Sequence, residues 1–387
     1  MKWLFDLFRI DLDATNRVFG LDILRTFSIL MVVETHGYHL LQDYGPNNFS
    51  LFPCLDKIVI SFVLSGYLIG SFLIKAYNRP DFRFKQISTF WVRRWLRTVP
   101  THFIVITGLI VLRYSFTTVG FHFPWQHYLF LQNFHNHETD TYYFYPEGWS
   151  LSIEEWFYFL IPALILVANF LLRSFMAKKQ LILSVILSVI FASTCLRLYK
   201  AYTNPDDTMY MLNINVTRIV LYRLDTLMYG VLAAFIRYYY WDSWIKYRKP
   251  LFYASLVLMA GTLAGYLFFL QHLLWVQTFY FTQVAIIVAM SLPQFAEMKF
   301  GKGFWLKFVT YFSKISFCIY LLNRTPILKS MMQVFPARNL SMAIAEYIIF
   351  WILVLLASTL YHKYVEKPIL DFREKVSPSE NGHKVAT

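Results

Sequence analysis

The chain has 387 residues, of which 57% are hydrophobic and only 15% are charged, whereas a soluble domain carries roughly 25% charged residues. This composition excludes an ordinary soluble globular protein, because too few polar side chains are available to cover its surface. The formal net charge of +13 does not indicate nucleic acid as a partner, because multi-pass membrane proteins retain Lys and Arg on the cytoplasmic side of the bilayer.

Apolar segments recur along nearly the whole chain, and each is long enough to cross a bilayer as a helix, which takes about 20 residues. We therefore predict an all-α, polytopic membrane protein with about ten transmembrane helices in one membrane domain over residues 21–370. The helices are expected at residues 21–41, 56–76, 97–114, 150–172, 181–199, 217–239, 250–270, 273–292, 308–328 and 341–361.

The connecting segments predict the topology. Most of the 36 Lys and Arg residues fall in the segments that lie on the same side as the N-terminus, which predicts cytoplasmic N- and C-termini. Residues 1–20 are predicted to be a cytoplasmic interfacial segment, and residues 371–387 a polar cytoplasmic tail. The outer loop 115–149 holds an aromatic stretch that is too short to span, and it could re-enter the membrane.

Cysteine and histidine spacing gives no metal or disulfide signal. Cys54, Cys195 and Cys318 are widely separated and odd in number, so no disulfide framework is expected. Four histidines of the outer loop match no ligand spacing and are expected to be solvated, so we predict no metal: His122, His127, His135 and His137.

The first predicted helix, GLDILRTFSILMVVETH, places Asp22, Arg25 and His36 on one face. Arg25 and His36 are about 16 Å apart along the axis, so Arg25 lies toward the cytoplasm and His36 toward the outer leaflet. A buried neutral imidazole could take a proton from an acceptor hydroxyl. The alternative is a packing histidine bonded to a neighbouring helix.

Two further segments carry candidate residues. In SFVLSGYLIG, Gly66 and Gly70 form a GxxxG pair that explains close helix packing, with Ser65 beside it. In RRWLRTVP, at the entrance of the third helix, three arginines could bind the phosphates of a nucleotide-bearing donor. Simple anchoring on the positive inner side is the alternative for these residues, Arg93, Arg94 and Arg97.

The segment GWSLSIEEWFY opens the fourth helix and holds adjacent acids. Glu155 has capping-box spacing from Ser152, which predicts a structural role at the helix start. Glu154 lies one turn from Ser150 and Tyr158, and these three form a polar stripe that could contact an acceptor or a catalytic partner. Intramembrane charges are functional candidates by default or pair with one another, and three more occur later in the chain: Arg223, Asp225 and Glu366.

These elements, in this order, resemble acyltransferase family 3 of membrane O-acyltransferases. The family pattern has an arginine and then a histidine in helix one, SGxLI, RxxR, WSLSxEExFY, RxDxLxxG and a closing YxxxExP, which correspond here to residues between Arg17 and Pro368. The resemblance implies that acetyl-CoA is the donor and a hydroxyl of a cell-envelope glycan the acceptor. Many relatives carry an extra SGNH domain, and a stand-alone form without it is expected here.

The resemblance also implies residue roles. His36 corresponds to the catalytic histidine, Arg25 to its partner, and Arg94 and Arg97 to the RxxR pair; Glu154 and Glu366 match the acids of their motifs. Three positions depart from the pattern: Ser61 replaces the usual phenylalanine, Asn323 stands where a histidine is frequent, and Glu34 takes an apolar place.

The leading hypothesis is therefore an O-acetyltransferase of the bacterial inner membrane. It would move acetyl from acetyl-CoA to a polysaccharide or lipopolysaccharide hydroxyl, with His36 as base or acyl carrier. Buried charges also build proton relays, so a proton-coupled transporter of sugars or small molecules is the alternative. A non-catalytic glycan-binding protein is a third hypothesis. The partners expected are membrane lipids and the glycan, and the sequence leaves the oligomeric state open.

Overall fold

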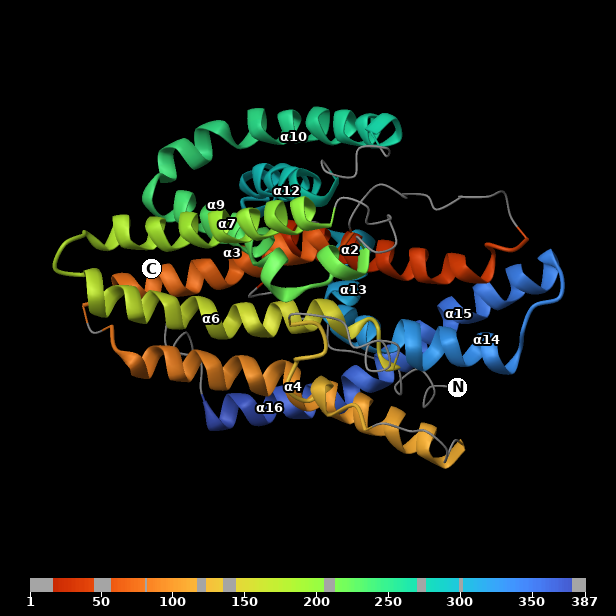
Figure 1. Ribbon diagram of the computed structural model, residues 1–387. Helices are drawn as coiled ribbons and strands as arrows, with labels where there is room; N and C mark the ends of the chain where they lie inside the picture. Colours follow the sequence, from red (N-terminus) through yellow and green to blue (C-terminus); the bar gives the residue numbers. More distant parts are fainter. Residues whose placement is uncertain are drawn as a thin grey trace.

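The computed structural model describes residues 17–44, 57–80, 82–116, 123–134, 144–204, 213–269, 276–298 and 302–377. Within these residues it is helical and has no strand (Figure 1), which confirms the predicted all-α class. Predictions for residues 1–16 and 378–387, and for parts of the outer loop, lie outside the described residues.

The described residues form the following helices, given in chain order. The α-helices are α2 (Phe19–Gly37), α3 (Lys57–Asn78), α4 (Phe84–Phe116), α6 (Gly148–Leu172), α7 (Lys178–Thr203), α9 (Val220–Tyr239), α10 (Trp241–Phe269), α12 (Phe281–Ala296), α13 (Gly303–Leu322), α14 (Ser330–Val334), α15 (Leu340–Tyr361) and α16 (Lys367–Val376). Short 3₁₀ and π segments join some of them: η1 (Tyr38–Leu40), η2 (Trp125–His127), η3 (Asn213–Thr217), η4 (Val276–Tyr280), η5 (Asn323–Lys329) and η6 (His362–Glu366).

The described residues contain seven helical segments that are long and apolar enough to cross a membrane: Lys57–Asn78, Phe84–Arg113, Gly148–Leu172, Lys178–Thr203, Thr278–Ala296, Gly303–Val334 and Leu340–Val376. The chain is therefore a multi-pass membrane protein. The three other predicted spans are the helices α2, α9 and α10, which carry several charged residues each. The count of about ten spans and the side of each terminus stay predictions.

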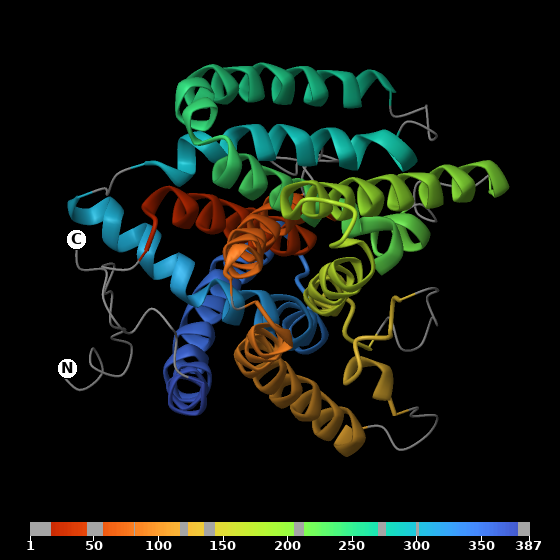
Figure 2. The same cartoon turned by 90° about the vertical axis from the view of Figure 1, so that its left-hand side faces the viewer.

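The helices run alongside one another, with α10 and α12 on one edge of the bundle and α4 and α16 on the opposite edge (Figures 1 and 2). Helices α3 and α9 pack tightly between these edges. A Cβ on Gly66 would lie 1.9 Å from the backbone oxygen of Leu227, and one on Gly230 would lie 2.0 Å from that of Val63. The predicted packing role of Gly66 is therefore confirmed.

The predicted start of the third helix was wrong. Helix α4 begins at Phe84 rather than near residue 97, so the arginines of RRWLRTVP lie inside a helix and not in a loop. The first turns of α4 are polar, so a prediction based on apolar segments places the start of the helix too late. Helix α16 continues to Val376, within the segment 371–387 that is predicted to be a polar cytoplasmic tail, and the cytoplasmic assignment stays a prediction.

A π-helical segment, η5, directly follows α13. Segment η5 begins at Asn323 and contains Pro326. Proline has no N–H to donate to the preceding turn, which favours a local departure from the α-helical hydrogen-bond pattern. The turn is held instead by Glu147, whose carboxylate accepts hydrogen bonds from the backbone N–H and the hydroxyl of Thr325, each at 2.7 Å. Such turns often occur at functional sites.

Candidate active site

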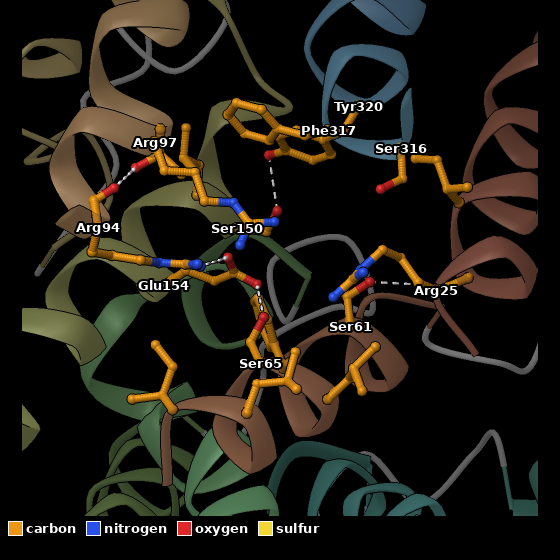
Figure 3. Close-up of a pocket in the computed structure, with 18 of the residues that line it drawn as sticks. Arg25, Ser61, Ser65, Arg94, Arg97, Ser150, Glu154, Ser316, Phe317 and Tyr320 are labelled. Atoms are coloured by element: carbon orange, nitrogen blue, oxygen red, sulfur yellow. Dashed lines mark hydrogen bonds and ion pairs between the residues drawn. The ribbon is translucent and has the colours of Figure 1, made fainter. Parts of the chain in front are cut away.

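A cavity of about 340 Å³ lies among α2, α3, α4, α6 and α13, with α16 at one end. Five arginines line it and Glu154 is the only carboxylate among the lining residues (Figure 3). An excess of positive charge in a space with apolar walls favours an anionic ligand. The polar lining consists of Arg25, Ser28, Ser61, Ser65, Arg93, Arg94, Arg97, Thr98, Ser150, Glu154, Ser316, Tyr320 and Arg373.

The α4 arginines enter the cavity at what we call its arginine end, together with Arg373 of α16. The guanidinium of Arg94 lies over the ring of Tyr158, 3.9 Å from the centroid, and donates to its hydroxyl. Arg93 pairs with Glu374 at 2.7 Å and donates to the carbonyl of Ser377. Two of the three predicted donor-binding arginines are thus held by protein partners.

Arg97 differs from them. Its side chain points into the cavity (Figure 3), yet it makes no hydrogen bond or ion pair with any residue that the structure describes. Arg97 is partly buried, and burial of a guanidinium is costly unless an anion or hydrogen-bond acceptor compensates its charge. The arrangement is suited to a ligand that brings its own negative charge.

Glu154 is the centre of a polar network on the cavity wall. Its carboxylate accepts hydrogen bonds from Ser65 at 2.9 Å and Tyr158 at 2.8 Å, and it lies 3.8 Å from Arg94. The structure thereby brings together four residues that the sequence singled out on three different helices. The network holds Arg94 and the acid in fixed positions on the wall.

The capping-box interpretation of Glu155 was wrong. Helix α6 begins at Gly148, so Ser152 lies inside the helix, where its hydroxyl donates to the Gly148 carbonyl at 3.3 Å. Glu155 is buried and accepts a 2.6 Å hydrogen bond from Thr98 of α4. Both acids of the motif therefore fix α6 to neighbouring helices.

Asp22 and Arg25 occupy the first turns of α2. Asp22 is buried and accepts two 2.7 Å hydrogen bonds from Arg17 and one of 2.6 Å from Ser313. Its contact with Arg25 is longer, at 3.4 Å. Asp22 does not line the cavity, whereas Arg25 extends into it (Figure 3). The aspartate thus anchors the start of α2, and Arg25 remains directed at the cavity.

His36 lies one turn beyond the last cavity-lining residue of α2, Val32, and is not itself among the lining residues. Its Nδ1 is 2.5 Å from Oδ1 of Asn323 at the start of η5. Residues Arg25, Ser28, Val32 and His36 follow one helical stripe, so the histidine continues the cavity wall rather than facing another way. We call this region the histidine end.

At the histidine end, Ser150 of α6 donates to the hydroxyl of Tyr320 at 2.8 Å, and that hydroxyl donates to the carbonyl of Glu147. Glu147 itself precedes α6. Burial raises the pKa of its carboxyl, although the hydrogen bonds from Thr325 act in the opposite direction. These contacts join the start of α6 to α13 and η5.

Arg223, Asp225 and Gly66 are among the predicted candidates that lie away from the cavity lining. The Arg223 guanidinium is 4.0 Å from the centroid of the Phe281 ring. Asp225 forms a fully buried bidentate pair with Arg197 of α7, at 2.8 and 2.7 Å, as the expectation of pairing among buried charges implied. Gly66 serves the packing of α3 against α9. Their surroundings indicate structural roles.

Glu366 lies at the end of η6 in a buried group with His362 and Cys318. One carboxylate oxygen is 2.6 Å from His362 Nδ1 and accepts from the Cys318 thiol at 3.0 Å. The three donor atoms lie within 4.8 Å of one another and could hold a metal ion. The two hydrogen bonds account for the grouping without an ion, and the absence of a metal stays a prediction.

Comparison with known sequences gives the family. The profile described as "Acyltransferase domain" matches residues 18–363, which is most of the chain. The chain belongs to acyltransferase family 3. No solved structure matches this acyltransferase.

Curated relatives of this acyltransferase are O-acetyltransferases by name. It is 30% identical over 210 residues to "Putative peptidoglycan O-acetyltransferase YrhL" of Bacillus subtilis, a match that covers 49% of this chain and 30% of that protein. It is 26% identical over 207 residues to "Peptidoglycan O-acetyltransferase OatA" of Listeria monocytogenes, with 49% and 30% covered. The acyltransferase therefore matches about a third of the length of these relatives.

Several residues of the acyltransferase site were not singled out as functional by sequence. Asn323 was noted only as a departure from the family pattern, and nothing local marked Arg373 or Tyr320. His127, expected to be solvated, is fully buried and its carbonyl faces His102 at 3.3 Å. These placements depend on contacts between helices far apart in the chain, and no sequence signal available here would have found them.

Proposed function

We propose that this acyltransferase transfers an acetyl group from acetyl-CoA to a hydroxyl of a carbohydrate acceptor in the bacterial cell envelope. The names of its relatives support O-acetyl transfer. The observation that carries the proposal is Arg97, a cation directed into the cavity with no described partner. Phosphate groups are the anions that arginine binds best, through paired N–H donors.

The donor would enter at the arginine end. Arg97 would bind a phosphate of the CoA moiety, and Arg93 and Arg373 lie at the same end to bind the others. The extended pantetheine arm would then follow the cavity between α2, α3 and α13. Its thioester would reach toward the histidine end, while Arg25 lies along the route.

The acceptor would meet the thioester at the histidine end. The hydroxyl oxygen forms a bond to the acetyl carbonyl carbon as its proton passes to His36, and the bond between that carbon and the CoA sulfur breaks. The proton on His36 then neutralises the departing thiolate, so that ester and CoA are the products. A general base of this kind contributes about 10²–10⁴ in rate. In the alternative order of events, the acetyl group is transferred first to the His36 ring, and the acceptor hydroxyl then takes it from this acetyl-histidine.

The test uses full-length protein in nanodiscs with labelled acetyl-CoA and fragments of host envelope glycan as acceptors. We expect transfer by the wild type and loss of transfer in His36→Ala, with acetyl-CoA binding retained. His39→Ala is the matched control, because His39 is exposed and, among the residues that the structure describes, Gln42 is its only hydrogen-bond partner. A folded His36→Ala protein with full transfer activity would refute the role of His36.

Mass spectrometry of the surface glycans of host cells with and without the gene would identify the acceptor. We expect acetyl esters that disappear when the gene is deleted and return with the wild-type copy. Unchanged glycans, together with no transfer or hydrolysis of acetyl-CoA in nanodiscs, would reject the proposed function.

A further inference from the structure

Asn323 is fully buried and is the first residue of η5, directly after the end of α13. Its side-chain oxygen is 2.5 Å from Nδ1 of His36, and its side-chain nitrogen is 2.7 Å from the carbonyl oxygen of Ile319 and 3.0 Å from that of Tyr320. All three contacts are within hydrogen-bond distance.

These contacts fix the orientation of the amide. Backbone carbonyl oxygens only accept hydrogen bonds, so the group that faces Ile319 and Tyr320 must be the NH₂ group. If the amide were turned over, its oxygen would face two carbonyl oxygens at these distances, which is an unfavourable contact between acceptors, and both hydrogen bonds of the NH₂ group would be lost. Therefore the oxygen of Asn323 faces His36.

The orientation of the amide decides the tautomer of the histidine. An amide oxygen has no hydrogen to give, so Nδ1 of His36 must carry the proton and donate it. In the neutral ring the other nitrogen, Nε2, then has a lone pair. Nε2 makes no hydrogen bond with any described residue, so its lone pair is available to an incoming group.

We propose that Asn323 is the positioning residue of His36: it holds the imidazole as the Nδ1–H tautomer, so that Nε2 is the atom that accepts the proton of the acceptor hydroxyl. This inference rests on the proposed function for its catalytic part. During transfer the ring gains a proton on Nε2 and loses it to the CoA thiolate, while Nδ1–H remains bonded to Asn323 throughout.

The position of Asn323 in the fold supports this role. Ser316 and Tyr320 line the cavity from α13, and Asn323 follows them at the next step of the same helical stripe. His36 follows Val32 of α2 in the same way. The two walls of the cavity thus end in two side chains that are bonded to each other.

The tautomer is measured directly by ¹⁵N magnetic resonance of histidine-labelled full-length protein in lipid, with His36 identified from the spectrum of His36→Gln. We expect Nδ1 to be protonated and Nε2 to carry the lone pair in the neutral ring. A neutral His36 with its proton on Nε2 would overturn the proposal, whether or not the protein transfers acetyl groups.

Two variants separate positioning from folding. Asn323→Leu should shift His36 toward the Nε2–H tautomer and lower kcat by about 10- to 100-fold, a part of the contribution of a general base, with an unchanged KM for acetyl-CoA. Asn323→Asp keeps an acceptor for Nδ1–H but turns its second oxygen toward the carbonyl oxygens of Ile319 and Tyr320, so it should restore the tautomer and part of kcat, with the pH profile of the rate moved upward. An Asn323→Leu protein with wild-type kcat would contradict the proposal.

The matched control is Asn78→Leu. Asn78 also donates to a carbonyl of its own helix, that of Ile74 at 2.8 Å, and accepts from the hydroxyl of Tyr239 at 3.0 Å, but it does not line the cavity. It should leave kcat and the His36 spectrum unchanged. If the wild type transfers no acetyl group, the proposed function fails, and the spectrum still decides whether Asn323 sets the tautomer.

Discussion

Glu374 of α16 is bound to Arg93 of α4, with 2.7 Å between Oε1 and Nη2. The same oxygen is 2.5 Å from Arg373, so one carboxylate contacts two arginines of the cavity lining. Helix α16 follows the last predicted span, and this contact holds it against α4. The carboxylate therefore lies at the arginine end, where a phosphate of the donor would also bind.

Removal of the Glu374 charge should strengthen donor binding, because the carboxylate competes with phosphate for the two arginines. The Glu374 side chain is 43% exposed, so the gain is small: we expect Glu374→Gln to lower the Kd for acetyl-CoA by about two- to fivefold. Calorimetric titration of protein in nanodiscs measures it. Asp371→Asn, which removes an exposed partner of Lys367 on the same helix, should leave the Kd unchanged.

Arg97 should matter more for donor binding than its neighbours. Arg97→Gln removes a cation that no described residue pairs with, and we expect the Kd for acetyl-CoA to rise about tenfold or more, the value of a charge-assisted hydrogen bond. The thermal midpoint should not fall, because no hydrogen bond or ion pair with a described residue is lost. Arg113→Gln, at the exposed far end of α4, serves as the control. If Arg97→Gln binds acetyl-CoA with the wild-type Kd, Arg97 has a role in membrane topology and not in donor binding.

The buried pair of Arg197 and Asp225 should be essential for stability rather than for chemistry. Asp225→Asn leaves the guanidinium without its charge partner in a fully buried place, which costs about 3–5 kcal/mol. Thermal unfolding in detergent should show a clear drop in the midpoint. The double variant Arg197→Met/Asp225→Leu should recover part of it, whereas Asp242→Asn, at an exposed position, should have no effect. A more stable single variant would rule out this account.

The packing of α3 against α9 predicts that alanine substitutions at different glycines have very different effects on folding. A Cβ at Gly66 would lie 1.9 Å from a backbone oxygen, and backbone cannot move aside cheaply. Gly66→Ala should therefore sharply reduce the amount of folded protein recovered by size-exclusion chromatography. Gly108→Ala, where nothing lies within 4 Å of the new atom, should be recovered at the wild-type level.

The sequence predicted the helices well where apolar residues form the signal. Segments 150–172 and 341–361 match α6 and α15 within a few residues. The starts of α4 and α10 were missed, because their first turns are polar and amphipathic and carry no apolar window. The motifs also indicated the residues that line the cavity from α4 and α6, since these residues are close together along the chain.

By itself, the sequence determined that this protein is a helical, multi-pass membrane protein of an acyltransferase family, because hydrophobic length and local motifs are properties of contiguous residues. Only the tertiary structure decided which charges are paired and which are directed into the cavity. Arg94 and Arg97 look equivalent in the RxxR motif, yet one is held by Tyr158 and Glu154 and the other has no described partner. Likewise, the contact of His36 with Asn323 joins residues 287 positions apart, and such a contact exists only once helix packing has brought them together.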